Sequence, residues 1–335
     1  MPTGGGTARA AAPPPAGTEP PSCDAPPPEA RHAVPRPAPT VPGLAGVAPH
    51  ARQPGGVRQV VLDADGLALS GLLCEPVGPP RALVVAVHGG GMRAGYFHGQ
   101  ARPGLSLLEL GARLGCTVLA LDRPGYGRSA AALPNGLPVA EQTPLLRAAL
   151  ADFARRHPVG AGHFVLAHSF GGKLALSLAA HAHDGDGLLG VDISGCGRQY
   201  APGAEDEVLH HRPAARRRHW GPLRLYPPGT FRHSAGTVAP MPEREAAELA
   251  AWPGMFDRLA PRVRVPVRFT FAEHELWWRR REPDLAALAD AFTTAPRVLL
   301  EHQQDAGHNI SLGWAARAYH LRALAFLEEC LPPGA

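Results

Sequence analysis

The sequence predicts an α/β fold with a doubly wound, mostly parallel sheet. Short apolar runs rich in β-branched residues recur along the chain, as is typical of strands that are buried on both faces. Helical segments alternate with these runs, and glycine-rich turns directly follow several of them. Because ligands bind at the carboxyl ends of the strands in such sheets, these turns are the candidate positions for chemistry.

Regular structure is predicted from about Val57 onward. Two β-type runs, Gln59–Leu62 and Leu67–Cys74, flank a turn at 64–66 and predict a hairpin. The alternating part then comprises, in order, strand Ala82–Val87, helix Leu105–Leu114, strand Thr117–Leu121, helix Val139–Arg156, strand Phe164–Ala167, helix Lys173–His183 and strand Leu188–Ile193. It resumes with strand Val265–Phe271, helix Asp284–Phe292, strand Arg297–Glu301 and the amphipathic helix Ala315–Cys330.

Two segments fall outside this alternation. Residues 1–55 are dominated by proline, alanine and glycine, which predicts a disordered leader or, alternatively, a start site placed too far upstream. Residues 197–262 are rich in arginine, histidine and proline and contain several aromatic residues. A structureless loop of about 60 residues within a compact domain is improbable, so we expect a cap or lid here. The core is then formed by residues 56–196 and 263–335.

Composition and charge argue against several classes of protein. The formal net charge of +4 comes almost wholly from scattered arginines, since Lys173 is the only lysine, and no nucleic-acid partner is expected. The five cysteines are widely spaced without a CxxC pair, as expected for reduced thiols. No apolar run approaches the ~18–20 residues of a membrane helix, and no secretory signal is visible. We therefore expect a cytoplasmic protein without a membrane partner.

Ser169 is the candidate nucleophile. It lies between a predicted strand and a predicted helix in the pentapeptide 167–171 (AHSFG), a variant of the G-x-S-x-G turn with alanine at the first position. Small residues two positions before and after the serine let strand and helix approach closely, and the tight turn exposes the hydroxyl. A serine in a glycine-rich turn without a catalytic function is the alternative interpretation.

Backbone amides near this serine are candidates for an oxyanion hole. The Phe170 amide lies at the predicted helix N-terminus and points toward the position of a developing oxyanion. The glycines of the segment 88–91 (HGGG) follow strand Ala82–Val87, and we expect the amides of Gly90 and Gly91 to provide the other donors. A turn used only for close packing is the alternative. His88 is expected to brace the loop rather than transfer a proton.

His308 is the candidate general base, because a loop between the last strand and the last helix can bring it to the serine hydroxyl. The acid that orients this histidine is expected after strand Val265–Phe271, where Glu275 fits the expected depth into the turn. Glu273, and Asp192 at the end of the preceding strand, are the alternatives.

Two further motifs receive no catalytic assignment. The segment 122–129 (DRPGYGRS) is rich in glycine but lacks both G-x-G-x-x-G and a P-loop lysine, which predicts a rigid loop beside the site and no catalytic role for Asp122. Arginines 216–218 in the predicted cap are interpreted as a solvated helix face. Attraction of an acidic substrate or of an acyl carrier protein is the alternative.

Taken together, these segments resemble the α/β-hydrolase superfamily from about residue 57 to 332. The resemblance is carried by HGGG at 88–91, DRPGYG at 122–127, HSFGG at 168–172, an acid after the penultimate strand and GH at 307–308, in the family's order. It implies the α/β-hydrolase fold with an eight-stranded sheet, a cap inserted after the sixth strand, and the chain order Ser169, Glu275, His308. The departures are Ala167 for glycine, glutamate for the commoner aspartate, and Lys173 early in the helix.

The expected function is hydrolysis of a small-molecule carboxylic ester or thioester through an acyl-enzyme on Ser169, without a metal or a cofactor. An acyltransferase or cyclising enzyme of secondary metabolism using the same three residues is the alternative. A non-catalytic ligand-binding protein on this scaffold is a third hypothesis, against which the intact set of residues argues. The substrate and the oligomeric state are not evident from the sequence.

Overall fold

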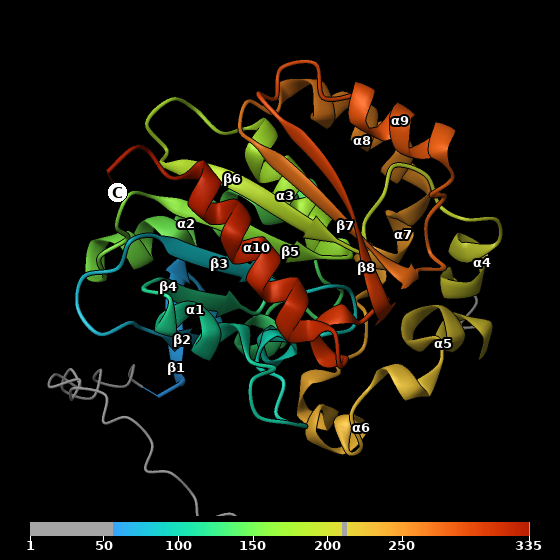
Figure 1. Ribbon diagram of the computed structural model, residues 1–335, viewed down its shortest axis with the longest axis horizontal. Coiled ribbons are helices and arrows are strands. Elements are labelled where there is room, and N and C mark those ends of the chain that lie inside the picture. Colours follow the sequence, from blue (N-terminus) through green and yellow to red (C-terminus); the bar gives the residue numbers. More distant parts are fainter. Residues whose placement is uncertain (1–55, 210–212, 335) are drawn as a thin grey trace, which may run out of the picture. The chain divides into compact units, whose positions relative to one another are not determined.

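A twisted eight-stranded sheet forms the centre of the structure, a computed structural model that describes residues 56–209 and 213–334 (Figure 1). The strand order is β1-β2-β4-β3-β5-β6-β7-β8. β1 and β2 form the predicted antiparallel hairpin, β2 pairs antiparallel with β4, and the remaining pairings are parallel. The strands are β1 (Arg58–Ala64), β2 (Leu67–Cys74), β3 (Leu83–Val87), β4 (Thr117–Leu121), β5 (His163–His168), β6 (Leu188–Ser194), β7 (Val267–His274) and β8 (Val298–Gly307). The predicted leader lies outside the described residues.

The central strands confirm the prediction that continuous apolar runs form strands buried on both faces. β3 and β4 are buried at every position, because helices cover both faces of the sheet. The edge strand β8 extends six residues beyond the predicted 297–301 at its C-terminal end and starts one residue later. Its later side chains, such as His302 and Gln304, are exposed to solvent at the sheet edge, so they interrupt the apolar pattern without ending the strand.

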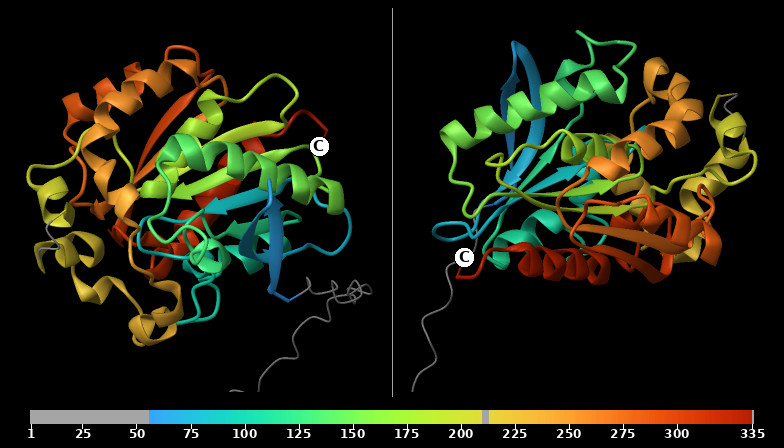
Figure 2. Two further views of the ribbon diagram at one scale, coloured as in Figure 1. Left: turned by 180° about the vertical axis from the view of Figure 1, so that it is seen from behind. Right: turned by 90° about the horizontal axis from the view of Figure 1, so that it is seen from above.

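Helices cover the two faces of the sheet in separate layers (Figure 2). One layer contains α1 (Leu107–Arg113) and α10 (Ala316–Cys330). The other contains α2 (Val139–Arg156), α3 (Phe170–Ala180), α8 (Trp252–Leu259) and α9 (Glu282–Asp290). The bounds of α2 are those predicted, whereas α3 begins three residues earlier than the predicted 173, since its first turn contains two glycines that are weak helix formers. No helix within the described part of the chain is long and apolar enough to cross a bilayer.

The segment between β6 and β7 is helical. It contains α4 (Ala204–Leu209), α5 (Pro213–Trp220), α6 (Thr230–His233) and α7 (Glu243–Ala247), followed by α8. Figure 1 shows α4 to α7 gathered at the end of the sheet toward which the arrows of β7 and β8 point. Helix α8 packs against α3 and buries Trp252 and Phe256 in the core cluster on that face. We refer to residues 197–262 as the insert.

Candidate active site

Ser169 lies in the tight turn between β5 and α3. Its backbone has φ 53° and ψ −119°, a combination that L-residues rarely adopt and that costs on the order of 1–3 kcal/mol. The turn is closed by Gly171, where an added Cβ would lie 2.3 Å from the carbonyl oxygen of Val87 and 2.6 Å from that of His88. Glycine at 171 therefore allows α3 to start directly against the end of β3, which leaves the serine side chain at the tip of the turn.

A chain of hydrogen bonds connects Ser169 with His308 and Glu275. Nε2 of His308 is 3.1 Å from Oγ of Ser169, and Nδ1 of His308 is 2.8 Å from Oε2 of Glu275. Both residues are buried, with 3% of His308 and 2% of Glu275 exposed. The pattern assigns the neutral histidine a proton on Nδ1, donated to Glu275, and leaves Nε2 free to accept from the serine hydroxyl.

The structure distinguishes among the three candidate acids. Glu273 is exposed, and its carboxylate accepts a hydrogen bond of 2.8 Å from the backbone amide of Asp305. Asp192 is buried in an ion pair with Arg268 and accepts from the hydroxyl of Tyr319 at 3.0 Å. Glu275 alone among the three contacts His308.

The carboxylate of Glu275 is held in its ionised form. Burial by itself would raise its pKa, but the adjacent His308 and the backbone amide of Trp277, 2.9 Å from Oε1, lower the pKa below its usual value overall. A group buried in this way stays charged only because each oxygen has a donor. Glu275 is therefore an acceptor that orients His308, and not a proton donor.

Two of the three residues expected to supply oxyanion donors line the same cavity as Ser169. Gly90 and Phe170 line this cavity together with the serine. The amide of Gly91 instead donates a hydrogen bond of 3.1 Å to the hydroxyl of Tyr126, so this amide is already engaged. The expectation for Gly91 is therefore corrected, because a tyrosine from the neighbouring loop takes up its N–H.

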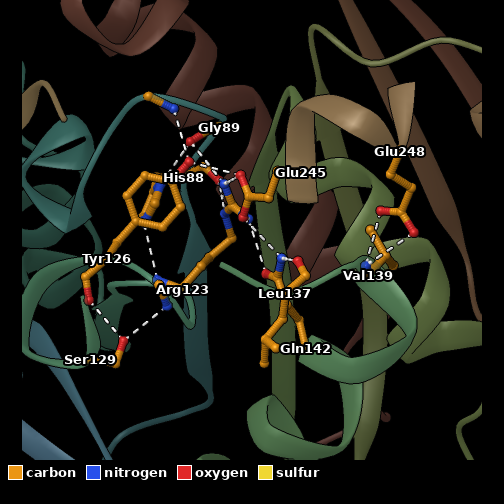
Figure 3. Close-up of polar contacts among 12 residues, drawn as sticks. His88, Gly89, Arg123, Tyr126, Ser129, Leu137, Val139, Gln142, Glu245 and Glu248 are labelled. Atoms are coloured by element: carbon orange, nitrogen blue, oxygen red, sulfur yellow. Dashed lines mark hydrogen bonds and ion pairs between the residues drawn. The ribbon is translucent and has the colours of Figure 1, made fainter. Parts of the chain in front are cut away.

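The loop that carries Gly90 is braced by a buried network (Figure 3). Nδ1 of His88 donates to the carbonyl of Gly89 at 2.8 Å, and its Nε2 accepts from the amide of Arg123 at 3.1 Å. The Arg123 guanidinium donates to the carbonyls of His88 and Gly89 at 2.8 and 3.2 Å. It also donates to both oxygens of Glu245, at 2.5 and 3.0 Å, and to Gln142 at 3.0 Å. His88 thus braces the loop, as expected from the sequence.

The segment 122–129 also has the structural role predicted for it. The carboxylate of Asp122 accepts from the Ser70 hydroxyl at 2.6 Å and from the Ala94 amide at 2.8 Å. These contacts anchor the loop to a side chain of β2 and to the backbone at Ala94, and Asp122 has no contact with Ser169 among those described. The ion pair of Arg123 with Glu245 was not anticipated, because its partners are 122 residues apart in the chain.

A narrow cavity opens directly onto Ser169. Its volume of about 50 Å³ is enough for a few non-hydrogen atoms, since one water needs about 10–15 Å³. Apart from Ser169 and the two oxyanion candidates, its lining is largely aromatic and apolar and consists of Lys173, Tyr200, His219, Met241, Leu249, Trp277 and Trp278. Sequence reasoning noted Lys173 only as a departure from the family pattern. A single lysine within one helical turn of the candidate nucleophile was the available signal.

His219 on α5 brings the insert close to the base. Its ring centroid lies 4.8 Å from that of Trp277 and 6.1 Å from that of His308. Burial, with a smaller contribution from the nearby His308, lowers the pKa of His219 to about 4, so this imidazole is neutral at neutral pH. Of the arginines preceding it, Arg218 forms an ion pair with Glu207 at 2.6 Å and is not a free solvated charge.

Comparisons with known proteins agree with this architecture. A family model described as "Alpha/beta hydrolase family" matches residues 84–333. A mutant of the N-acyl homoserine lactonase AidH, complexed with N-hexanoyl homoserine, is similar in structure with a TM-score of 0.60 and 13% identity, covering 82% of this chain and 98% of that chain. An esterase from Thermogutta terrifontis with bound malate has a TM-score of 0.54 at 18% identity, covering 82% and 100%.

A third similar structure is the thioesterase domain from the curacin biosynthetic pathway, with a TM-score of 0.52 and 17% identity, covering 81% of this chain and 100% of that chain. At these identities the similarity concerns the fold. The search of curated proteins found no match. The family model spans more than half of the chain, including most of the strands of the eight-stranded, mostly parallel sheet. The chain belongs to the α/β-hydrolase family.

Proposed function

We propose that this protein is a serine hydrolase that cleaves a carboxylic ester or thioester through an acyl-enzyme. The observation that carries the proposal is the continuous hydrogen-bonded chain from Ser169 through His308 to Glu275. In the proposed reaction, Nε2 of His308 takes the proton of Ser169 as Oγ attacks the substrate carbonyl. Glu275 stabilises the imidazolium that forms, because it accepts the hydrogen bond from Nδ1.

The negative charge that develops on the carbonyl oxygen requires donors beside the serine. The amides of Gly90 and Phe170 have this role in the proposal, since both residues line the cavity with Ser169. His308 then donates its proton to the leaving group. A water molecule, activated by the same histidine, attacks the acyl-enzyme and releases the acid.

The insert acts as the cap in this proposal. Tyr200, His219, Met241 and Leu249 all belong to residues 197–262 and form much of the cavity wall around the acyl group. Their positions support a role of the insert in choosing the substrate. The reducing environment expected from the cysteines supports a cytoplasmic location as part of the same proposal.

Labelling with a fluorophosphonate probe and turnover of short-chain esters test the proposal together. We expect the wild-type protein to be labelled and to hydrolyse esters, and Ser169→Ala to lose both properties. Undiminished turnover by Ser169→Ala would contradict the mechanism, and failure of the probe to label the wild-type protein would favour a non-catalytic scaffold. Product analysis separates hydrolysis, which yields the free acid, from acyl transfer or cyclisation, which yields a new ester, amide or lactone.

A further inference from the structure

The only lysine of the chain lies beside the candidate nucleophile. Lys173 is on α3, four residues after Ser169, which is about one helical turn and a rise of about 6 Å. Ser169 immediately precedes the helix, and Lys173 lies in its first turn. The Lys173 side chain lines the cavity that opens onto Ser169, although only 2% of the residue is exposed to solvent.

Aromatic rings, and not carboxylates, surround the ammonium group. Nζ of Lys173 lies 4.9 Å from the ring centroid of Phe170, 5.2 Å from that of Trp252 and 5.3 Å from that of Tyr200. Rings at this distance stabilise a cation through their quadrupoles, but more weakly than a hydrogen-bonded carboxylate. Within residues 56–209 and 213–334, no carboxylate oxygen lies within ion-pair distance of Nζ, and the charges of Glu245 and Glu248 act only from farther away.

The ammonium also retains unused hydrogen-bonding capacity. A protonated lysine has three N–H donors. One of them is donated to the Tyr200 hydroxyl at 2.6 Å. Among the described residues, this hydroxyl is the one hydrogen-bond acceptor of the ammonium group. Burial lowers the pKa of Lys173 to about 8, so the group is mainly cationic at neutral pH. A buried cation with free donors is costly unless a ligand supplies an acceptor.

Lys173 is the only cation that lines the cavity among the described residues. Met241, Leu249 and Trp278 present apolar or aromatic surface, and the buried indole N–H of Trp277, which has no partner among the described residues, is a neutral donor. Because Ser169 and Lys173 both line it, the cavity complements a short acyl group that is apolar along its length and anionic at its end.

We propose that Lys173 is a specificity-determining residue that binds the terminal carboxylate of a short dicarboxylic acyl group. The substrate class is then a half-ester or half-thioester of an acid such as succinate or glutarate, cleaved at the bond facing Ser169. This inference rests on the proposed hydrolase function and specifies its substrate. Lys173 makes no bond in the reaction; its ammonium donates hydrogen bonds to the carboxylate while Ser169 attacks the other end.

Paired substrates test the proposal with the full-length enzyme. The ethyl half-esters of succinate and glutarate are each compared with the ethyl ester in which an isopropyl group replaces the free carboxylate. Turnover at neutral pH is measured from the protons that hydrolysis releases. We expect the wild-type kcat/KM to favour the better half-ester over its isopropyl partner about tenfold or more, the range of a hydrogen bond to a charged group. Lys173→Met, which keeps the length of the side chain, should abolish or reverse that preference.

Two outcomes would overturn the inference while leaving the hydrolase intact. One is a wild-type preference for the isopropyl esters, a result that needs no variant and therefore does not depend on whether Lys173→Met folds. The other is an equal loss on both members of each pair in Lys173→Met, which would assign the lysine a structural role among Phe170, Tyr200 and Trp252. Labelling of Lys173→Met by a fluorophosphonate, at whatever rate, shows that the turn that carries Ser169 is still formed.

A binding measurement separates failure of this inference from failure of the proposed function. Calorimetry on Ser169→Ala with the two half-esters requires no turnover. We expect binding that is weakened about tenfold or more by the additional substitution Lys173→Met. Binding without turnover by the wild-type protein would keep the site and refute the hydrolase, whereas ester turnover combined with half-ester affinity that is unaffected by Lys173→Met would refute the site alone.

Discussion

Arg123 and Glu245 form a buried, bidentate ion pair that connects the loop of Gly90 to helix α7 of the insert. The side chains are 1% and 0% exposed, and the same guanidinium holds the carbonyls of His88 and Gly89. The hydroxyl of Tyr126 donates a hydrogen bond of 2.8 Å to Glu245 and accepts one from the amide of Gly91. The insert is thus connected by hydrogen bonds to the backbone that is proposed to bind the oxyanion.

Removing the acid of this pair is expected to be strongly destabilising. Glu245→Ala leaves the Arg123 charge buried without its partner, which costs about 3–5 kcal/mol of the free energy of unfolding. Chemical denaturation measures this loss. Glu243→Gln on the same helix is the matched control, since Glu243 is exposed, and it should stay within about 0.5 kcal/mol of wild type. A change of similar size in both variants would contradict the structural role of the pair.

Glu275→Gln tests the choice of the acid. The amide is nearly isosteric but can donate to Nδ1 of His308 and so favours the wrong tautomer, and we expect kcat for ester hydrolysis to fall about 10⁴-fold. Glu273→Gln is the control, because that carboxylate contacts the Asp305 amide and should be replaceable within a few-fold. If Glu273→Gln were the inactive variant, the assignment from the structure would be wrong.

Gly195→Ala tests how closely His308 must be placed. An added Cβ would lie 2.9 Å from Cε1 and 3.0 Å from Nδ1 of His308, and the φ of 58° adds backbone strain. Displacement of the base should lower kcat about 10²-fold. Gly185→Ala is the control. Gly185 also has a positive φ, of 95°, but nothing lies within 4 Å of an added Cβ, so this variant introduces backbone strain without a steric contact. It should lose about 1 kcal/mol of stability and keep its activity.

The buried lysine predicts a specific dependence of stability on pH. The pKa of Lys173 is lowered from 10.5 to about 8 in the folded protein, so between these values the unfolded chain binds more protons. The free energy of unfolding of wild type should therefore rise with pH across this window relative to that of Lys173→Met. Below pH of about 8 the penalty for burying the charge is fully present, and the difference between the two proteins should be flat.

Denaturation of both proteins at several pH values measures this difference. Comparing the two at each pH cancels the contributions of buried groups that do not interact with Lys173, such as Cys116 and Tyr126, whose pKa values are raised by burial. A difference that does not change between neutral and alkaline pH would show that Lys173 titrates as an exposed lysine does.

The sequence by itself determined the strand and helix order, the turn at Ser169 and the loop position of His308. These features follow from local physics: continuous apolar runs mark strands buried on both faces, and a serine between small residues at a strand–helix junction marks a tight turn. The length of β8 was underestimated for the same reason, since an edge strand tolerates polar residues that end an apolar pattern.

Only the tertiary structure decided which carboxylate contacts His308, which amides remain free and what surrounds Lys173. Glu273 and Glu275 are two residues apart, and the irregular pairing of β7 with β8 after Ala272 directs one to the Asp305 amide and the other to the imidazole. Likewise, the Tyr126 hydroxyl accepts a hydrogen bond from the Gly91 amide. These outcomes depend on contacts between residues distant in the chain, whose geometry no local pattern encodes.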